Sequence, residues 1–350
     1  MGFQALAFNI TNGIENTALG YRALYNNTTG DNNIAVGSSA LTANTTGSNN
    51  VANGAGALTG NTTGNNNIAF GYIALTNNTI GNDNIASGLY ALRFNTTGNN
   101  NVANGSSALT SNTTGSSNIV SGTDSLPNST TGSNNIAIGF NALFYNNSAT
   151  NTTAVGFKAG YGVAGTSNQN NSLFGYQAGL GLSTGSNNLL FGYQAGDAIT
   201  TGSNNIIIGY DIDATSTSMT GGLNIGNLIF GTGIDGTGTT ISSGNIGIGT
   251  STPGAKLAVH GNALFSGNLN VANITATGTI TVPNLSGTST IGSITFGPGE
   301  RVRVLIGTTT GSNFFASTGD FAGFEVATRT IAFNSGADGS LGPWATSTSS

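Results

Sequence analysis

The sequence predicts an all-β fold, a parallel β-roll (β-solenoid) built from stacked coils of 17 residues. Three observations support this prediction. A glycine-ended apolar block recurs at a fixed interval, Gly and Asn interrupt every stretch that a helix would need, and only 5% of the 350 residues are charged. Ordinary soluble domains carry about 25% charged residues, and a short fixed period is the signature of stacked repeats.

The period is clearest at the glycine that closes each block of the type "IAxG". This glycine occurs at positions 20, 37, 54, 71, 88, 105, 122, 139, 156, 175, 192 and 209. The spacing is 17 residues everywhere except for one step of 19, between Gly156 and Gly175. An "NTTG" segment and an "AL" pair return in phase with it. Each repeat is therefore expected to form one coil of a solenoid.

Within one coil we expect two short strands and two tight turns. The segments "NNIAVG" (32–37) and "SSALTAN" (38–44) are predicted as strands, and "TTGSN" (45–49) as a turn in which glycine adopts a positive φ. Stacked coils place equal positions about 4.8 Å apart, so each backbone pairs with the coils on either side. This geometry leaves little room for large side chains inside a coil.

Stacking also explains the asparagines, because a column of identical amides can hydrogen-bond from coil to coil. The residues predicted to form this structural ladder are Asn33, Asn50, Asn67, Asn84, Asn101, Asn118, Asn135, Asn188 and Asn205. The "NTTG" segments create N-x-S/T sequons at Asn44, Asn61, Asn95 and Asn112, which we interpret as by-products of the repeat.

Paired apolar residues such as Ile34-Ala35 and Ala40-Leu41 indicate strands that are buried on both faces. A strand with one buried face would alternate apolar with polar residues. One face would line the coil interior, and another copy of the chain is the economical partner for the other face.

Repeats of the type "GSSALTANTTGSNNVANG" (37–54) resemble the head repeats of trimeric autotransporter adhesins (YadA-like) and of phage-type trimeric tail fibres. The resemblance covers about residues 2–210. It implies a homotrimer of left-handed parallel β-rolls packed about one axis. A second segment, "GNIGIGTSTPGAKLAVHGNA" (244–263), is similar to a connector of trimeric fibre proteins.

Four segments are expected along the chain. Residues 1–210 form the β-roll, 211–261 an irregular transition and connector, 262–298 a Gly/Ser/Thr-rich β shaft or neck, and 299–350 a C-terminal β segment with a flexible tail. The last segment concentrates arginines and aromatic residues, so we expect it to contribute to recognition or to contacts at the fibre end.

The sequence disfavours most catalytic and ligand-binding functions. We predict that the protein is not an enzyme and has no catalytic residue and no cofactor. Seven Lys and Arg residues are too few and too scattered for a nucleic-acid-binding surface. The sequence contains no 18-residue apolar run that could span a membrane. His260 is the only histidine and there is no cysteine, so a nucleophile and base pair of those types is not available. "GTGIDG" (231–236) matches a dinucleotide-binding pattern without the helix that the pattern requires. Asp211 and Asp213 are weak candidates for a Ca²⁺ site.

The expected function is that of an extracellular structural or adhesive fibre at a cell surface, assembled from its own copies, end to end as well as side by side. Its partner would be a cell-surface glycan or protein receptor. The alternative is a virion tail fibre or spike that binds a host receptor. A minor alternative is an ice-binding solenoid, because threonines recur in register at Thr28, Thr45, Thr62, Thr79, Thr96 and Thr113. An aromatic column is the candidate contact surface, as a self-stacking ladder or a sugar-binding strip, at Phe140, Phe157, Tyr176, Tyr193 and Tyr210.

Overall fold

The computed structural model describes residues 4–6 and 13–266, and in this part of the chain there are β-strands and turns but no helix. Sixteen short strands follow one another in a single sheet in chain order. They are β1 (Thr17–Leu19), β2 (Ile34–Val36), β3 (Val51–Asn53), β4 (Ile68–Phe70), β5 (Ile85–Ser87), β6 (Val102–Asn104), β7 (Ile119–Ser121), β8 (Ile136–Ile138), β9 (Thr153–Val155), β10 (Ser172–Phe174), β11 (Leu189–Phe191), β12 (Ile206–Ile208), β13 (Leu223–Ile225), β14 (Ile229–Thr232), β15 (Asn245–Ile248) and β16 (Leu257–Val259).

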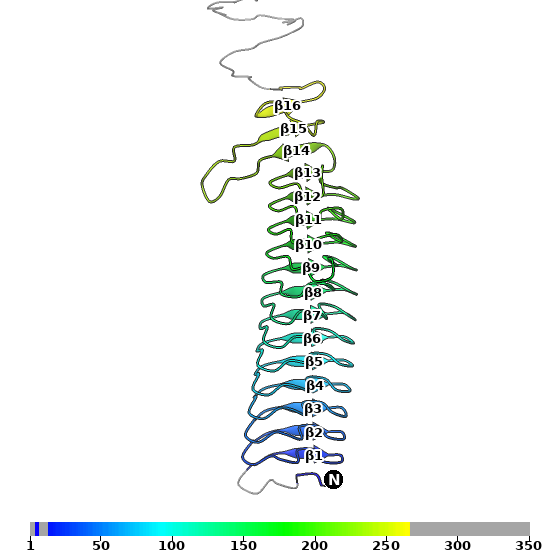
Figure 1. The fold of residues 1–350 in the computed structure, drawn as a ribbon, viewed down its shortest axis with the longest axis vertical. Helices are drawn as coiled ribbons and strands as arrows, with labels where there is room; N and C mark the ends of the chain where they lie inside the picture. Colours follow the sequence, from blue (N-terminus) through cyan, green and yellow to red (C-terminus); the bar gives the residue numbers. More distant parts are fainter. Residues whose placement is uncertain (1–3, 7–12, 267–350) are drawn as a thin grey trace, which may run out of the picture. The chain divides into compact units, whose positions relative to one another are not determined.

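Strands β1 to β13 pair in parallel, each with the next, and they stack as successive coils (Figure 1). Ile34 pairs with Val51 and Val51 with Ile68, so the register advances by one 17-residue repeat at each step. The 19-residue step lies between β9 and β10, where Thr153 pairs with Ser172. The predicted all-β stack of 17-residue coils is therefore confirmed.

The regular parallel stack extends through β13, one coil beyond residue 210. After β13 the pairing changes, because β13–β14 and β14–β15 are antiparallel and β15–β16 is parallel again. Of the predicted neck at 262–298 only residues 262–266 belong to the described part of the chain. The predicted C-terminal segment 299–350 lies outside the described residues.

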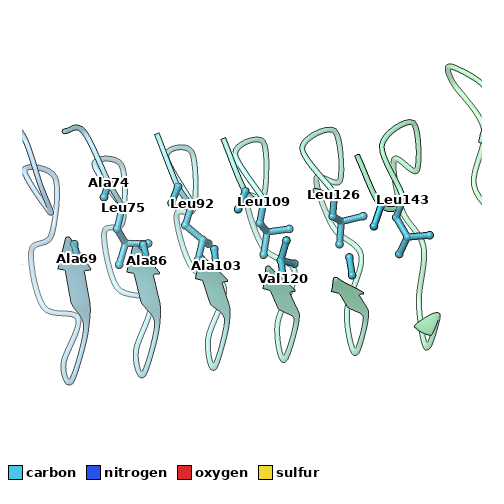
Figure 2. Close-up of a cluster of buried hydrophobic side chains, with 14 of the residues drawn as sticks. Ala69, Ala74, Leu75, Ala86, Leu92, Ala103, Leu109, Val120, Leu126 and Leu143 are labelled. Carbon is cyan, nitrogen blue, oxygen red and sulfur yellow. The ribbon is translucent and has the colours of Figure 1, made fainter. Parts of the chain in front are cut away.

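The core of each coil is narrow, and in the coils of β1 to β6 it is built from small side chains and one leucine. The middle residue of each strand from β1 to β13 points inward, as Ala69 and Ala86 do, and both of these are fully buried. Figure 2 shows Leu75 and Leu92 beside the strand residues Ala86 and Ala103, and Leu109 beside Val120. In β10 and β11 the arrangement is reversed, because Leu173 and Leu190 occupy the strand centres and the turns carry alanine and glycine, and in β12 the strand centre is Ile207. The core is nevertheless one continuous apolar column.

The predicted second strand, "SSALTAN" (38–44), is wrong, because these residues form turns. Ser39 and Leu41 have φ values of 60° and 51°, in the left-handed region that an extended strand does not use. Their amides still pair between coils, since Leu41 N donates to the Ala57 carbonyl at 3.0 Å and Ser39 N donates to the Tyr21 carbonyl at 2.8 Å. Coil-to-coil hydrogen bonding therefore continues without strand geometry.

The same conformation corrects the inference of two buried faces from the "AL" pair. Ala40 and Leu41 are both fully buried in the interior of their own coil. Only the "IA" pair spans two faces, since Ala35 is buried and Ile34 points outward with 42% of its surface exposed. The case for an outer partner therefore depends on the strand residues alone.

Glycine after each strand is required by the approach of the next coil. Gly71 has a φ of 132°, and a Cβ at this position would lie 2.5 Å from the carbonyl oxygen of Gly88. No side chain fits at that distance, and L residues rarely adopt this φ. This explains why glycine closes each block of the repeat.

Candidate interaction surfaces

The first residue of each strand points away from the coil interior, and together these residues form an apolar stripe that we call the outer strand column. Its exposed members include Ile34, Ile85 and Ile119, with 42%, 39% and 46% of their surface exposed. Thr153 and Ser172 interrupt the stripe at the 19-residue step. The full column from β2 to β13 is Ile34, Val51, Ile68, Ile85, Val102, Ile119, Ile136, Thr153, Ser172, Leu189, Ile206 and Leu223.

The third residue of each strand lies on the same outward side, because side chains two apart in a strand share a face. In the first coils this position is mixed, with Asn53 and Ser87 among its members. From β8 to β13 it is apolar, and Phe174 and Phe191 contact one another with ring centroids 5.9 Å apart. The apolar outer face is therefore wider in the later coils.

The aromatic column predicted from the sequence is a stack of rings. Phe140, Phe157, Tyr176, Tyr193 and Tyr210 follow one another with centroids 4.9–5.5 Å apart and interplanar angles of 6–14°. Neighbouring rings cover one another's faces, so the inner members offer their edges to a ligand. Tyr210 ends the series and is 74% exposed. Stacking of a sugar on a free ring face is therefore confined to the ends of the stack.

A second aromatic cluster, which the sequence interpretation missed, lies beside the 19-residue step. The Phe144 and Tyr161 rings stack with centroids 5.3 Å apart, and Tyr145 contacts both edge to face. Lys158 Nζ lies 5.2 Å from the Tyr161 ring centroid and 5.5 Å from that of Phe157, within cation–π range. Burial, followed by a hydrogen bond with Tyr145, raises the pKa of the Tyr161 phenol. The signal in the sequence was the local run "FNALFYNN", whose extra aromatics break the repeat.

The asparagines predicted as a ladder are buried and hydrogen-bonded between coils. Asn50 Nδ2 donates to Asn33 Oδ1 at 3.1 Å and to the Gly64 carbonyl at 2.8 Å, and the backbone N of Asn50 donates to the same Asn33 oxygen. The pattern repeats through Asn135, and Asn171, Asn188 and Asn205 continue it after the 19-residue step. We call this column the strand amide ladder. It satisfies the backbone just before each strand.

A second column, the turn amide ladder, comes from the first residue of "NTTG". Asn44 Nδ2 donates to Asn27 Oδ1 and to the Gly47 carbonyl, both at 2.8 Å. Its members in the coils of β1 to β6 are fully buried: Asn27, Asn44, Asn61, Asn78, Asn95 and Asn112. Four of them are the sequons noted above, so a glycan on any of those amides is incompatible with the folded coil.

The threonine array is also engaged with the backbone. Thr45 Oγ1 donates to the Thr62 carbonyl at 3.0 Å, and Thr62 Oγ1 donates to the Thr79 carbonyl at 2.9 Å. The hydroxyl hydrogens of this column therefore serve coil-to-coil bonding, which gives no specific support to an ice-binding face.

Titratable groups are few, and one cluster of three aspartates, Asp197, Asp211 and Asp213, lies near the end of the regular stack. Burial raises the pKa of Asp197, with further contributions from Asp213, through its charge and a hydrogen bond, and from the charge of Asp211. Asp213 Oδ1 also accepts a hydrogen bond from the backbone N of Ala198 at 3.2 Å. Among the described residues there is no group of three or more His, Cys, Asp or Glu side chains arranged to hold a metal ion.

The "GTGIDG" segment and His260 both lie at positions that show no ligand-binding or catalytic arrangement among the described residues. In "GTGIDG", Gly231 belongs to β14, an antiparallel strand, and residues 233–243 after it contain no helix that could bind a pyrophosphate. His260 is exposed, and its backbone N donates to the Ile248 carbonyl. No helix in the described part of the chain is long and apolar enough to cross a membrane.

The chain matches no protein-family model and no curated protein. Its function must therefore be argued from the repeat geometry and its exposed surfaces.

Proposed function

We propose that this protein is an extracellular structural and adhesive fibre, in which copies of the chain pack their outer strand columns together as a parallel homotrimer. The observation that carries the proposal is the outer strand column itself. It is a stripe of Ile, Val and Leu along β2 to β13, interrupted by Thr153 and Ser172, and much of it remains exposed in the single chain. A large exposed apolar surface usually marks an interaction site.

A second copy of the same chain is the partner that fits this stripe best. The apolar residues recur at the spacing of the parallel coils, and a covering surface must repeat at the same interval to contact each of them. Another copy of the chain has that spacing because it has the same sequence and fold. The net charge of −5 over 350 residues creates little repulsion between copies. The resemblance of the repeats to trimeric fibre heads supplies the number three.

Adhesion follows from the repetition of surface positions rather than from one deep pocket. Copies in a bundle present the same turn residues and aromatic edges many times along one fibre. Many weak contacts of this kind raise the overall affinity through effective concentration. A virion tail fibre with a host receptor is the second candidate, favoured by the same repeats because they resemble both classes; gene neighbourhood distinguishes the two.

The decisive experiment measures the mass of the full chain in solution and the effect of one charge in the outer strand column. Sedimentation at micromolar concentration should give about three times the chain mass of 34.7 kDa. Ile85→Asp should shift the protein toward monomer because the carboxylate would be desolvated at every copy of the interface. The β spectrum in circular dichroism should be retained, since Ile85 is 39% exposed in the single chain.

Ile80→Asp is the matched control. Ile80 is 51% exposed but lies in the turn, where neighbouring coils carry Thr63 and Thr97, so the same substitution should leave the mass unchanged. A stable monomer for the unaltered chain would refute the trimer. Adhesion is tested separately, by binding of the trimer and of the Ile85→Asp monomer to cells or glycan-coated surfaces, where the trimer should bind at least about tenfold more tightly. Equal binding by the two would refute multivalent adhesion.

A further inference from the structure

The turn amide ladder is interrupted in one coil, where Ser129 occupies the place of the asparagine. The coils before it carry Asn95 and Asn112 at this position, and the coil after it carries Asn146. The same coil also departs from the repeat at two other buried positions, Ser125 and Pro127. Its interior is therefore chemically unlike that of its neighbours.

In an intact coil the amide nitrogen at this position has two acceptors. Asn112 Nδ2 donates to Asn95 Oδ1 at 2.8 Å and to the Gly115 carbonyl at 2.9 Å. Gly115 O also accepts from Asn101 Nδ2, of the strand amide ladder, at 2.9 Å. Each turn carbonyl in this series thus accepts two amide hydrogens, one from each ladder.

At Ser129 the side chain replaces the amide oxygen but not the amide nitrogen. A Cβ at Gly132 would lie 2.7 Å from Ser129 Oγ, and the equivalent Cβ at Gly47 would lie 2.5 Å from Asn44 Oδ1. The hydroxyl oxygen therefore lies close to where other coils have Oδ1. The position of Nδ2, between this coil and the one before it, receives no atom from serine.

Three oxygens face that position. Asn112 Oδ1 and Ser129 Oγ are buried and have no hydrogen-bond partner within the described chain. Gly132 O accepts from Asn118 Nδ2 at 2.9 Å and retains the lone pair that the second ladder uses in the earlier coils. Beyond Ser129 the ladder also changes direction, because Asn146 Nδ2 donates forward to Asn168 Oδ1 at 3.1 Å, so no amide nitrogen turns back toward Ser129.

We propose that this position is a binding site for one buried water molecule, held by Asn112 Oδ1, Gly132 O and Ser129 Oγ. A water resembles an amide NH₂ group in size and, like it, donates two hydrogen bonds. These would go to Asn112 Oδ1 and Gly132 O, while the Ser129 hydroxyl donates to the water oxygen. Buried waters typically make about three such bonds to otherwise unpaired polar groups. The three ligands carry no formal charge, which disfavours a dehydrated cation.

A high-resolution crystal structure of the full chain tests this site directly. One ordered peak should lie about 2.7–3.2 Å from each of the three oxygens. Soaking the crystals in rubidium chloride distinguishes a water molecule from a monovalent cation at the site, because bound rubidium would give an anomalous peak there. An anomalous peak would overturn the water assignment, and so would a structure in which a protein donor reaches Asn112 Oδ1 or the site is dry.

Ser129→Asn gives a second, independent readout. The new amide should displace the water and complete the ladder, and it should raise the Tm by about 2–4 °C. Ser116→Asn is the matched control, since Asn82 and Asn99 already occupy that half-buried position in other coils, and its Tm should not change. If Ser129→Asn retains the water peak or lowers the Tm while Ser116→Asn is neutral, the proposed position of the water is wrong.

Discussion

Ala40 and Leu41 are neighbours in the chain, yet both side chains lie inside the same coil with no exposed surface. In an extended strand, adjacent side chains point to opposite faces. Here Leu41 adopts a φ of 51°, which turns its side chain back toward the interior. The left-handed conformation costs about 1–2 kcal/mol for a residue with a Cβ. Burial of the leucine and the hydrogen bond from Leu41 N to Ala57 O offset that cost in each coil.

Gly71→Ala should strongly destabilise the roll. Its Cβ would lie 2.5 Å from Gly88 O, and the φ of 132° is disfavoured for alanine, so the two coils would have to separate. We expect a loss of more than about 3 kcal/mol in the free energy of unfolding, measured by chemical denaturation. Gly56→Ser is the control, because Ser39 and Ser107 occupy the equivalent position with positive φ, and it should cost less than about 1 kcal/mol. Equal effects for the two variants would show that close approach of the coils is not what requires glycine.

Asn50→Asp and Asn49→Asp apply one isosteric change to adjacent residues with opposite surroundings. Asn50 is fully buried and donates to Asn33 Oδ1 and Gly64 O, so a carboxylate there faces two acceptors without a donor. It should destabilise the protein by roughly 3 kcal/mol or more. Asn49 is exposed with a φ of 59°, which Asp also tolerates, and its variant should lie within about 0.5 kcal/mol of the parent. Denaturation midpoints at neutral pH check both values, and a near-neutral Asn50→Asp would contradict a stabilising strand amide ladder.

When the chain is expressed in a glycosylating cell, exposed sequon asparagines should carry a glycan and buried ones should not. Asn61 is fully buried and hydrogen-bonds to Asn44 Oδ1, so folded, secreted protein should carry no glycan there. Asn77, in the sequon Asn77-Asn78-Thr79, is exposed and should accept a glycan without loss of the fold. Peptide mass spectrometry of the folded fraction provides the measurement. A glycan on Asn61 in protein with native β structure would be inconsistent with the buried ladder.

Because of Asp197, the free energy of unfolding should increase as the pH is lowered from 7. Burial, with the nearby Asp213 and Asp211, raises its pKa in the folded state, so folding disfavours the charged form. The penalty is present above the raised pKa and disappears as the pH falls through it toward the ordinary aspartate value. Asp197→Asn should therefore stabilise the protein at pH 7 and reduce this pH dependence. Tm measurements from about pH 3 to pH 7 check the sign, with Asp31→Asn at an unrelated position as the control; a destabilised Asp197→Asn at pH 7 would contradict it.

The sequence by itself determined the period, the stacking and much of the outward surface. A fixed 17-residue spacing places equal residues in equal surroundings, so the spacing alone predicts the register of Asn33 with Asn50. The 19-residue step between Phe157 and Tyr176 keeps the same phase, because the residues around each of them match. The inward position of the strand alanines follows from the same logic, since a narrow coil leaves little room opposite a buried leucine, and Leu173 and Leu190 take this position only where the turn carries glycine in place of the leucine. These features depend on the repeat, and the repeat can be read directly from the sequence.

The tertiary structure decided where the side chains of the turns point and which polar atoms pair. Nothing in the letters "AL" signals a left-handed leucine, because that conformation is locally unfavourable and is stabilised only by neighbouring coils. For the same reason the burial of Asn44 and the unpartnered oxygens of Asn112 and Ser129 emerged only in the folded chain. Local propensity cannot report these features, since each depends on hydrogen bonds and burial supplied by residues about 17 positions away.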